Sequence, residues 1–132
     1  SDHKMRIKGD LAGEAVEIAT EVESGRYKRV LFNGGTIRDY DKGYSMHLDL
    51  MERVKERNTA SKLEYHLISM PPKDFRLFER FKGLGNNLSM SLEVFNADLF
   101  SEVCPGKSQD YTRARFLSAF EAAVEILGRG NV

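Results

Sequence analysis

The sequence predicts an α/β fold in which three parallel strands alternate with helices. Apolar runs near residues 28–36, 63–70 and 87–95 indicate strands, and segments with apolar residues every three or four positions lie before, between and after them. Strands that alternate with helices form right-handed βαβ units, which makes the strands parallel and sequential. Such a pattern with a helix at each end predicts a slice of an α/β barrel or of a larger open sheet.

Composition and charge limit the class of protein. The 132 residues, 41% of them hydrophobic, suffice for a single α/β segment, residues 1–132, with a packed core. The 20 basic and 20 acidic residues are scattered and indicate neither a nucleic-acid nor a membrane-surface partner. Cys104 is the only cysteine, so this chain offers neither an internal disulfide nor a metal site made of several thiolates. Without a signal-peptide-like start or a membrane-length apolar run, a reducing, cytoplasmic setting is expected.

The first half of the chain begins with a helix. Asp10 is a good N-cap for it, and Gly25 is a natural residue to follow its end. The apolar positions of this helix are Leu11, Ala15, Ile18, Ala19 and Val22. After the first strand, a polar connection leads to a second helix that fades near Asn58. The connection contains Asp39, Asp41 and Gly43, and the apolar residues of the helix are Leu48, Met51 and Val54.

The second half is divided by prolines and glycines. Pro71 and Pro72 end the second strand, and Pro72 suits the first turn of a helix. This helix has an aromatic stripe and ends at two glycines: Phe75, Phe78, Phe81, Gly83 and Gly85. After the third strand Asn96 caps a short helix over 97–103, and the run 104–106 breaks the chain. We expect Ser108 to open the longest helix, which ends at Gly128, and 130–132 resemble the approach to a further strand.

The alternation of side chains favours a barrel wall. In the third strand one face is apolar and the other is partly polar, with Leu88, Met90, Leu92 and Val94 opposing Ser89, Ser91, Glu93 and Phe95. A sheet covered by helices on both sides would be apolar throughout, whereas a barrel interior holds polar groups for a ligand. The polar row could instead be solvated. We expect the face with Asn33, His66, Ser91 and Glu93 to be uncovered by helices of this chain.

Two positions are candidates for ligand contacts. Gly34 and Gly35 follow the first strand and allow close backbone approach to a ligand, although a plain strand-to-helix turn explains them equally well. Glu93 lies late in the third strand between apolar neighbours, where a carboxylate requires a cation or donors. It either contacts a ligand or forms a salt bridge with a nearby Lys or Arg. His66 is interpreted as a hydrogen-bonded structural residue.

The remaining polar groups carry weaker signals. Lys107 and Ser108 follow a glycine at a helix start, where an anion could bind, although capping alone explains Ser108. Arg113 and Arg115 are most simply exposed charges, unless one turns inward toward a ligand of Glu93. The acidic connection before the second helix resembles a calcium loop only superficially.

The order and spacing of several motifs resemble the core of a radical S-adenosylmethionine (SAM) enzyme. These motifs are Val30-Leu31-Phe32-Asn33-Gly34-Gly35-Thr36, Pro71-Pro72, Ser91-Leu92-Glu93-Val94-Phe95-Asn96, Cys104-Pro105-Gly106-Lys107 and the ending Gly128-Arg129-Gly130-Asn131-Val132. The resemblance implies a partial (β/α) barrel of which this chain supplies the second, third and fourth strands. It further implies cofactor-binding roles: Gly34, Gly35 and Thr36 stand where the family contacts the methionine amino group of SAM, and Glu93 stands at the fourth-strand position that commonly contacts its ribose. Arg113 is included if it turns inward.

The resemblance also has two departures. Thr36 stands where the family's Gly-Gly-Glu motif has Glu, and the CxxxCxxC cluster loop is absent. We therefore expect the middle segment of a radical SAM oxidoreductase, inactive alone, whose intact parent binds SAM and a 4Fe-4S cluster. This chain itself is expected to bind no cofactor or metal and to hold no catalytic residue. Its partners would be the rest of the parent enzyme, or a second copy along the exposed sheet face or edges.

Two alternatives stay open. One is a small self-contained α/β module that binds a ligand or partner without catalysis. The other is a slice of a phosphate-binding barrel enzyme, supported only by the helix start at residues 106–108.

Overall fold

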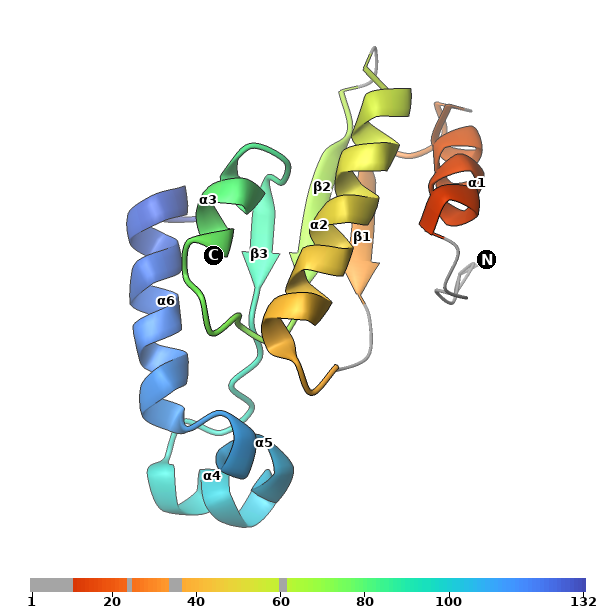
Figure 1. The fold of residues 1–132 in the computed structure, drawn as a ribbon. Helices are drawn as coiled ribbons and strands as arrows, with labels where there is room; N and C mark the ends of the chain where they lie inside the picture. Colours follow the sequence, from red (N-terminus) through yellow and green to blue (C-terminus); the bar gives the residue numbers. More distant parts are fainter. Residues whose placement is uncertain (1–10, 24, 34–36, 60–61) are drawn as a thin grey trace.

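The computed structural model describes residues 11–23, 25–33, 37–59 and 62–132, and it has the predicted α/β architecture (Figure 1). Helices and strands alternate as far as the third strand and are followed by three further helices. The elements are α1 (Leu11–Glu23), β1 (Arg29–Asn33), α2 (Tyr40–Arg57), β2 (Glu64–Ile68), α3 (Leu77–Lys82), β3 (Asn87–Ser89), α4 (Ala97–Val103), α5 (Pro105–Asp110) and α6 (Arg113–Leu127).

The sheet is parallel and its strands are in sequential order, β1-β2-β3, as predicted. Arg29 is paired with Glu64, and Leu67 with Leu88. All three arrowheads in Figure 1 point the same way, so the carboxyl ends of the strands share one edge, with α4 and α5 beyond it. The Leu88 amide donates to the Asn131 carbonyl at 2.8 Å, so the end of the chain lies against β3.

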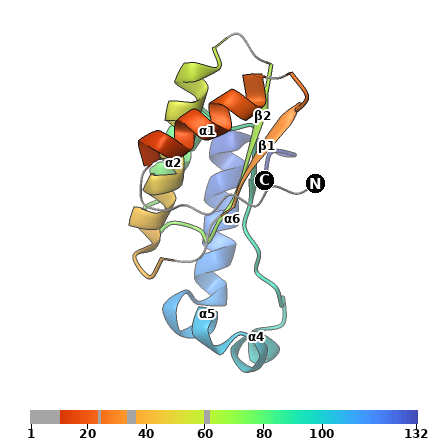
Figure 2. The same cartoon turned by 90° about the vertical axis from the view of Figure 1, so that its right-hand side faces the viewer.

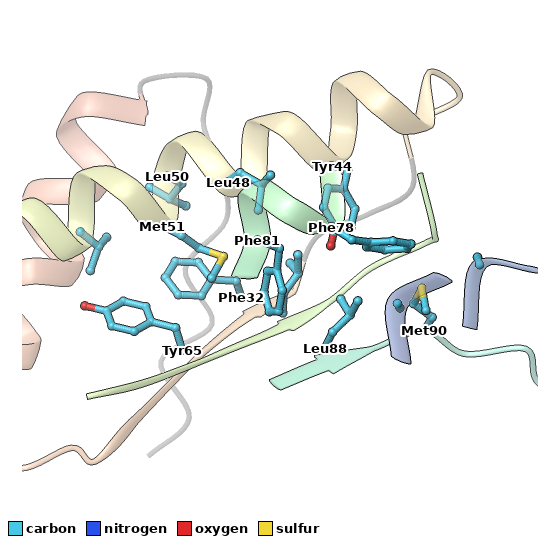
Figure 3. Packing of buried hydrophobic residues seen from close by; sticks show 14 of the residues in the cluster. Phe32, Tyr44, Leu48, Leu50, Met51, Tyr65, Phe78, Phe81, Leu88 and Met90 are labelled. Carbon is cyan, nitrogen blue, oxygen red and sulfur yellow. The ribbon is translucent and has the colours of Figure 1, made fainter. Parts of the chain in front are cut away.

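α1, α2 and α6 lie to one side of the sheet, while α4 and α5 lie beyond its carboxyl edge (Figure 2). Figure 3 shows α2 above the sheet, with Phe32, Tyr65 and Leu88 pointing up toward Met51 and the α3 rings Phe78 and Phe81. These side chains alternate with exposed ones in β1 and with half-buried or exposed ones in β2 and β3, which is the pattern of a sheet buried more deeply on one side.

The opposite face is uncovered in the part of the chain that the structure describes, as expected. Leu31 is 54% exposed there. Asn33 is exposed there as well, and His66 is half-buried. Ser91 and Glu93 are also exposed, but they lie beyond the end of β3 and so do not belong to the sheet face as predicted. One face of the sheet is therefore buried in the core, and helices of the described part of the chain leave the other face uncovered.

The helix ends follow local signals. Gly25 follows α1 with φ +69°, a conformation that glycine adopts without steric cost. The Asp39 carboxylate accepts from the Lys42 amide at 3.1 Å and caps α2, which ends at Asn58. Asn96 accepts from the amides at 98 and 99 and caps α4. Gly43 lies within α2 and not in the preceding connection as predicted, because the cap is at Asp39.

α3 also differs from its prediction at one end. It begins at Leu77 and not near Pro72, and it ends at Gly83 as expected. Gly85 then packs directly beneath Phe81, since a Cβ at Gly85 would lie 2.2 Å from a Phe81 ring carbon. The absence of a side chain at this position allows the chain to turn back toward the sheet.

The third strand is shorter than predicted. β3 ends at Ser89, and the Ser69 amide to the Ser89 carbonyl is the last bond that links it to β2. β2 ends at Ile68 and Pro71 and Pro72 follow it, so no strand of the described part of the chain lies beside residues 90–95. We refer to residues 90–95 as the Glu93 segment. Its alternation persists, because Leu92 and Val94 pack inward while Glu93 is exposed.

The last predicted helix is two helices. Tyr111, in an extended conformation, separates α5 from α6, and Thr112 caps α6 by accepting from the Arg115 amide. The Tyr111 hydroxyl donates to the Pro72 carbonyl at 2.9 Å. These residues are 39 positions apart, and no pattern in the sequence predicts the contact. Ser108 therefore opens no helix, and α2, with 18 residues, is longer than α6, with 15.

Candidate functional site

The carboxyl edge of the sheet holds the end of β1 and the segment that carries Glu93. Gly34, Gly35 and Thr36 follow the end of β1 but lie outside the described residues. The Glu93 segment leaves the end of β3 toward α4 and α5 (Figure 1). In a parallel sheet, loops at this edge commonly hold the ligand. Glu93 and the end of β1 therefore belong to the same edge, which is what the sequence predicts.

Glu93 occupies the apex of a tight turn. Its φ is +69°, the only positive φ of a non-glycine residue among the described residues. The Val94 amide donates to the Leu92 carbonyl at 2.9 Å, which closes a three-residue γ-turn around Glu93. A positive φ at a γ-turn centre is rare for a residue with a side chain, and such strained positions gather at ligand-binding sites.

Lys107 of α5 holds this turn from the side. Its Nζ donates to Glu93 Oε1 at 2.7 Å and to the Ser91 carbonyl at 3.1 Å. The Lys107 side chain is 29% exposed and that of Glu93 is 51% exposed. Glu93 thus forms a salt bridge with a nearby lysine, which is one of the two interpretations that the sequence left open. No hydrogen bond to Glu93 Oε2 occurs within the described part of the chain.

Arg113, at the start of α6, holds the same segment one step further on. Its Nε donates to the Phe95 carbonyl, and its guanidinium carbon lies 4.5 Å from the centre of the Phe95 ring. Arg113 thus contacts the Glu93 segment but makes no bond to Glu93 itself. Arg115 extends elsewhere, to the Lys73 carbonyl and over the Phe75 ring.

An aromatic cluster supports the Glu93 segment from behind. Its members are Tyr40, Phe100, Tyr111 and Phe116. Tyr111 and Phe116 meet edge to face with ring centres 5.0 Å apart, and burial raises the pKa of Tyr111 to about 12. Leu92 and Val94 pack against this cluster. The segment therefore has an apolar inner side and a polar outer side.

His66 lies on the open sheet face. Its Nε2 and the Ser89 hydroxyl are 2.8 Å apart across β2 and β3, so it is hydrogen-bonded as expected. Partial burial and, secondarily, the positive charge of Arg29 lower its pKa below the ordinary histidine value. The imidazole is therefore neutral near pH 7.

The other polar candidates have structural partners. Asp41 accepts from the amides of Lys73 and Asp74 and fixes the loop after β2. Its carboxylate therefore has a structural role here and not that of a calcium ligand. The Ser108 hydroxyl donates to the Pro105 carbonyl within α5. Cys104 is half-buried between α4 and α5. Among the described residues, no three His, Cys, Asp or Glu side chains are grouped to hold a metal ion.

A pocket of 510 Å³ opens at the opposite, amino end of the strands. It includes the ion pair of Arg29 and Glu64, 2.6 Å apart, and the amide side chains of residues 86, 87 and 131. None of the predicted site residues lines it. In the described ranges, no helix is long and apolar enough to cross a membrane.

Sequence reasoning missed the roles of Lys107 and Asp41. Lys107 lies 14 residues beyond Glu93, and Asp41 lies 32 residues before Lys73. Neither spacing follows a helix or strand period, so no local pattern links these partners. The only available signal was that Glu93 needs a cation.

The chain is similar to the bacteriochlorophyllide c C-7(1)-hydroxylase of Chlorobaculum limnaeum. The two sequences are 35% identical over 126 residues, which cover 89% of this chain and 30% of the hydroxylase. This chain therefore spans about 30% of the length of the curated relative that it matches. No protein-family model matches the chain, and no solved structure matches it.

Proposed function

We propose that this chain is one segment of a radical SAM oxidoreductase and supplies part of its SAM site. One observation carries the proposal: Glu93, the residue that the resemblance aligns with a ribose contact, lies in a strained turn at the carboxyl edge of a parallel sheet. The Gly34-Gly35 sequence follows the strand end at the same edge. One small ligand can therefore meet both positions.

The similarity to a hydroxylase supports an oxidative reaction for the whole protein. Hydroxylation of a carbon is an oxidation, and the relative carries it out on bacteriochlorophyllide c. We extend this reaction class, with a bacteriochlorophyllide-like substrate, to the full-length protein. Because this chain corresponds to only 30% of the relative, other segments would supply much of the substrate site.

The residues present fit SAM and do not fit the cluster. Glu93 offers a carboxylate oxygen that can accept hydrogen bonds from a ribose diol, while Lys107 balances its charge. When bound, the cluster supplies the electron that cleaves SAM. Cys104 is the only cysteine, so this chain cannot provide the thiolates that hold such a cluster. This chain alone would therefore be inactive.

Titration of SAM into the reconstituted full-length protein by calorimetry tests the proposal. Loss of a charge-assisted hydrogen bond costs about 1.5–3 kcal/mol, so Glu93→Ala should weaken SAM binding roughly ten- to hundredfold. Glu93→Gln keeps an acceptor and should be the milder change.

Glu64→Ala is the matched control. Glu64 is 49% exposed and forms an ion pair with Arg29, much as Glu93 does with Lys107, but it lies at the other end of the sheet. It should leave SAM affinity unchanged. If wild type fails to bind SAM, the proposed function is wrong and the self-contained module is favoured. If all variants bind SAM alike, Glu93 is a structural ion-pair residue.

A further inference from the structure

The Glu93 turn depends on contacts from residues later in the chain. The carbonyls that flank it, those of Ser91 and Phe95, accept from Lys107 and Arg113 respectively. Both cations thus bind the segment's own backbone. The apolar side chains of Leu92 and Val94 anchor its inner side. The segment is therefore fixed on both sides of Glu93, and none of the described strands pairs with it.

Lys107 differs from Arg113 because it also binds the Glu93 side chain. Its Nζ connects the Ser91 carbonyl with Glu93 Oε1, so backbone and carboxylate share one donor group. This double contact restricts both the turn and the rotamer of Glu93. One carboxylate oxygen is engaged, and the other is left to accept hydrogen bonds from outside.

We propose that Lys107 is a positioning residue for the SAM site, because it holds Glu93 in its γ-turn with Oε2 presented to the ligand. This inference rests on the proposed function and adds a residue to it. Lys107 acts through Glu93 and does not contact the ligand.

A double-mutant cycle in the full-length reconstituted protein tests this inference. Lys107→Met removes the ammonium but keeps a long chain, and it should weaken SAM binding about tenfold by calorimetry. In a Glu93→Ala background the same substitution should weaken binding no further, because the residue that Lys107 positions is already gone. Lys107→Arg can still donate to both oxygens, so it should stay within about threefold of wild type.

The control is Arg29→Met, which removes the cation of the matched ion pair at the amino end of the sheet. It should leave SAM affinity unchanged. Lys107→Gln serves as a second test if Lys107→Met folds poorly, and thermal melting of each variant reports folding. The ¹³C shift of the Glu93 carboxylate should move in Lys107→Met and not in Arg29→Met.

Two outcomes overturn the inference while the proposed function stands. One is that wild type binds SAM and Glu93→Ala weakens it, yet a folded Lys107→Met or Lys107→Gln variant binds like wild type. The other is an equal loss from Lys107→Met with and without the Glu93 side chain, which would make Lys107 an independent contact. Failure of wild type to bind SAM would instead refute the proposed function, and with it this inference.

Discussion

β1 and the Glu93 segment both alternate side chains that pack inward with side chains that are exposed, yet they are held by different kinds of contact. β1 is paired with β2 over all five of its residues, so main-chain bonds fix its place. In the Glu93 segment, the bond from the Val94 amide to the Leu92 carbonyl closes only a local turn. The side chains of Lys107 and Arg113 connect this segment to the rest of the fold.

The difference determines which mutations each region tolerates. A backbone ladder persists when an exposed side chain such as Leu31 is replaced, because every residue carries the same donor and acceptor. The Glu93 segment loses a backbone anchor when one distant side chain is shortened. A binding segment held in this way has a defined shape that point mutations can change without unfolding the sheet.

The largest loss of stability should come from replacing Phe116, which is fully buried in the aromatic cluster that packs against the Glu93 segment. Phe116→Ala should reduce the free energy of unfolding by about 3–5 kcal/mol, measured by urea titration. Amide chemical shifts should move at residues 90–95 and much less in β1. Phe95, 69% exposed, is the control, and its replacement by Ala should cost far less. Equal shifts in β1 and the segment would show that the two regions are not held separately.

A smaller effect should isolate the strain at Glu93. Glu93→Gly and Glu93→Ala both remove the contact with Lys107, but only glycine adopts φ +69° freely. We expect the Gly variant to be about 1 kcal/mol more stable than the Ala variant in urea titration. At Glu64 in β2 the order should reverse, since glycine in a strand is destabilising. The same order at both positions would contradict the left-handed turn.

The smallest effect is a change of stability with pH. It should depend on His47 in α2 and His66 in β2 and not on the Glu93 segment. Burial lowers the pKa of His47 and of His66 below the ordinary 6.5. The unfolded chain therefore binds protons more readily, so stability is full above about pH 6.5 and falls as pH decreases toward the folded-state values. Urea titrations at a series of pH values should show this slope.

Replacement of either histidine by Gln should flatten that slope. The Glu93 segment contains no histidine, so Lys107→Met should leave the pH dependence between about pH 5 and 7 unchanged. A slope that survives loss of both histidines would assign the titration to other groups.

Much of the fold could be predicted because its signals are local. Gly25, Asn58 and Asn96 end or begin helices as expected, since capping depends on residues within one turn. The parallel, sequential strands follow from alternation with helices. The end of β3 could not be predicted from its own residues, because a strand needs a partner and β2 had already ended.

The candidate site was only partly predictable for the same reason. The need of Glu93 for a cation could be inferred from its apolar neighbours, but the identity of Lys107 depends on how α5 folds back. That placement depends on Tyr111, whose hydroxyl donates to a carbonyl 39 residues away. Gly34, Gly35 and Thr36 lie outside the described residues, so their role stays a prediction, as does that of Arg113 toward a ligand.

The packing of Gly85 beneath the Phe81 ring has a consequence for how this sequence can evolve. A Cβ at position 85 would lie 2.2 Å from the ring, so any other residue there requires the ring to move or a smaller residue at position 81. Phe81 is itself fully enclosed in the core, so shrinking it first leaves a cavity. Each single step is unfavourable, and the two positions should therefore change together across a lineage or not at all.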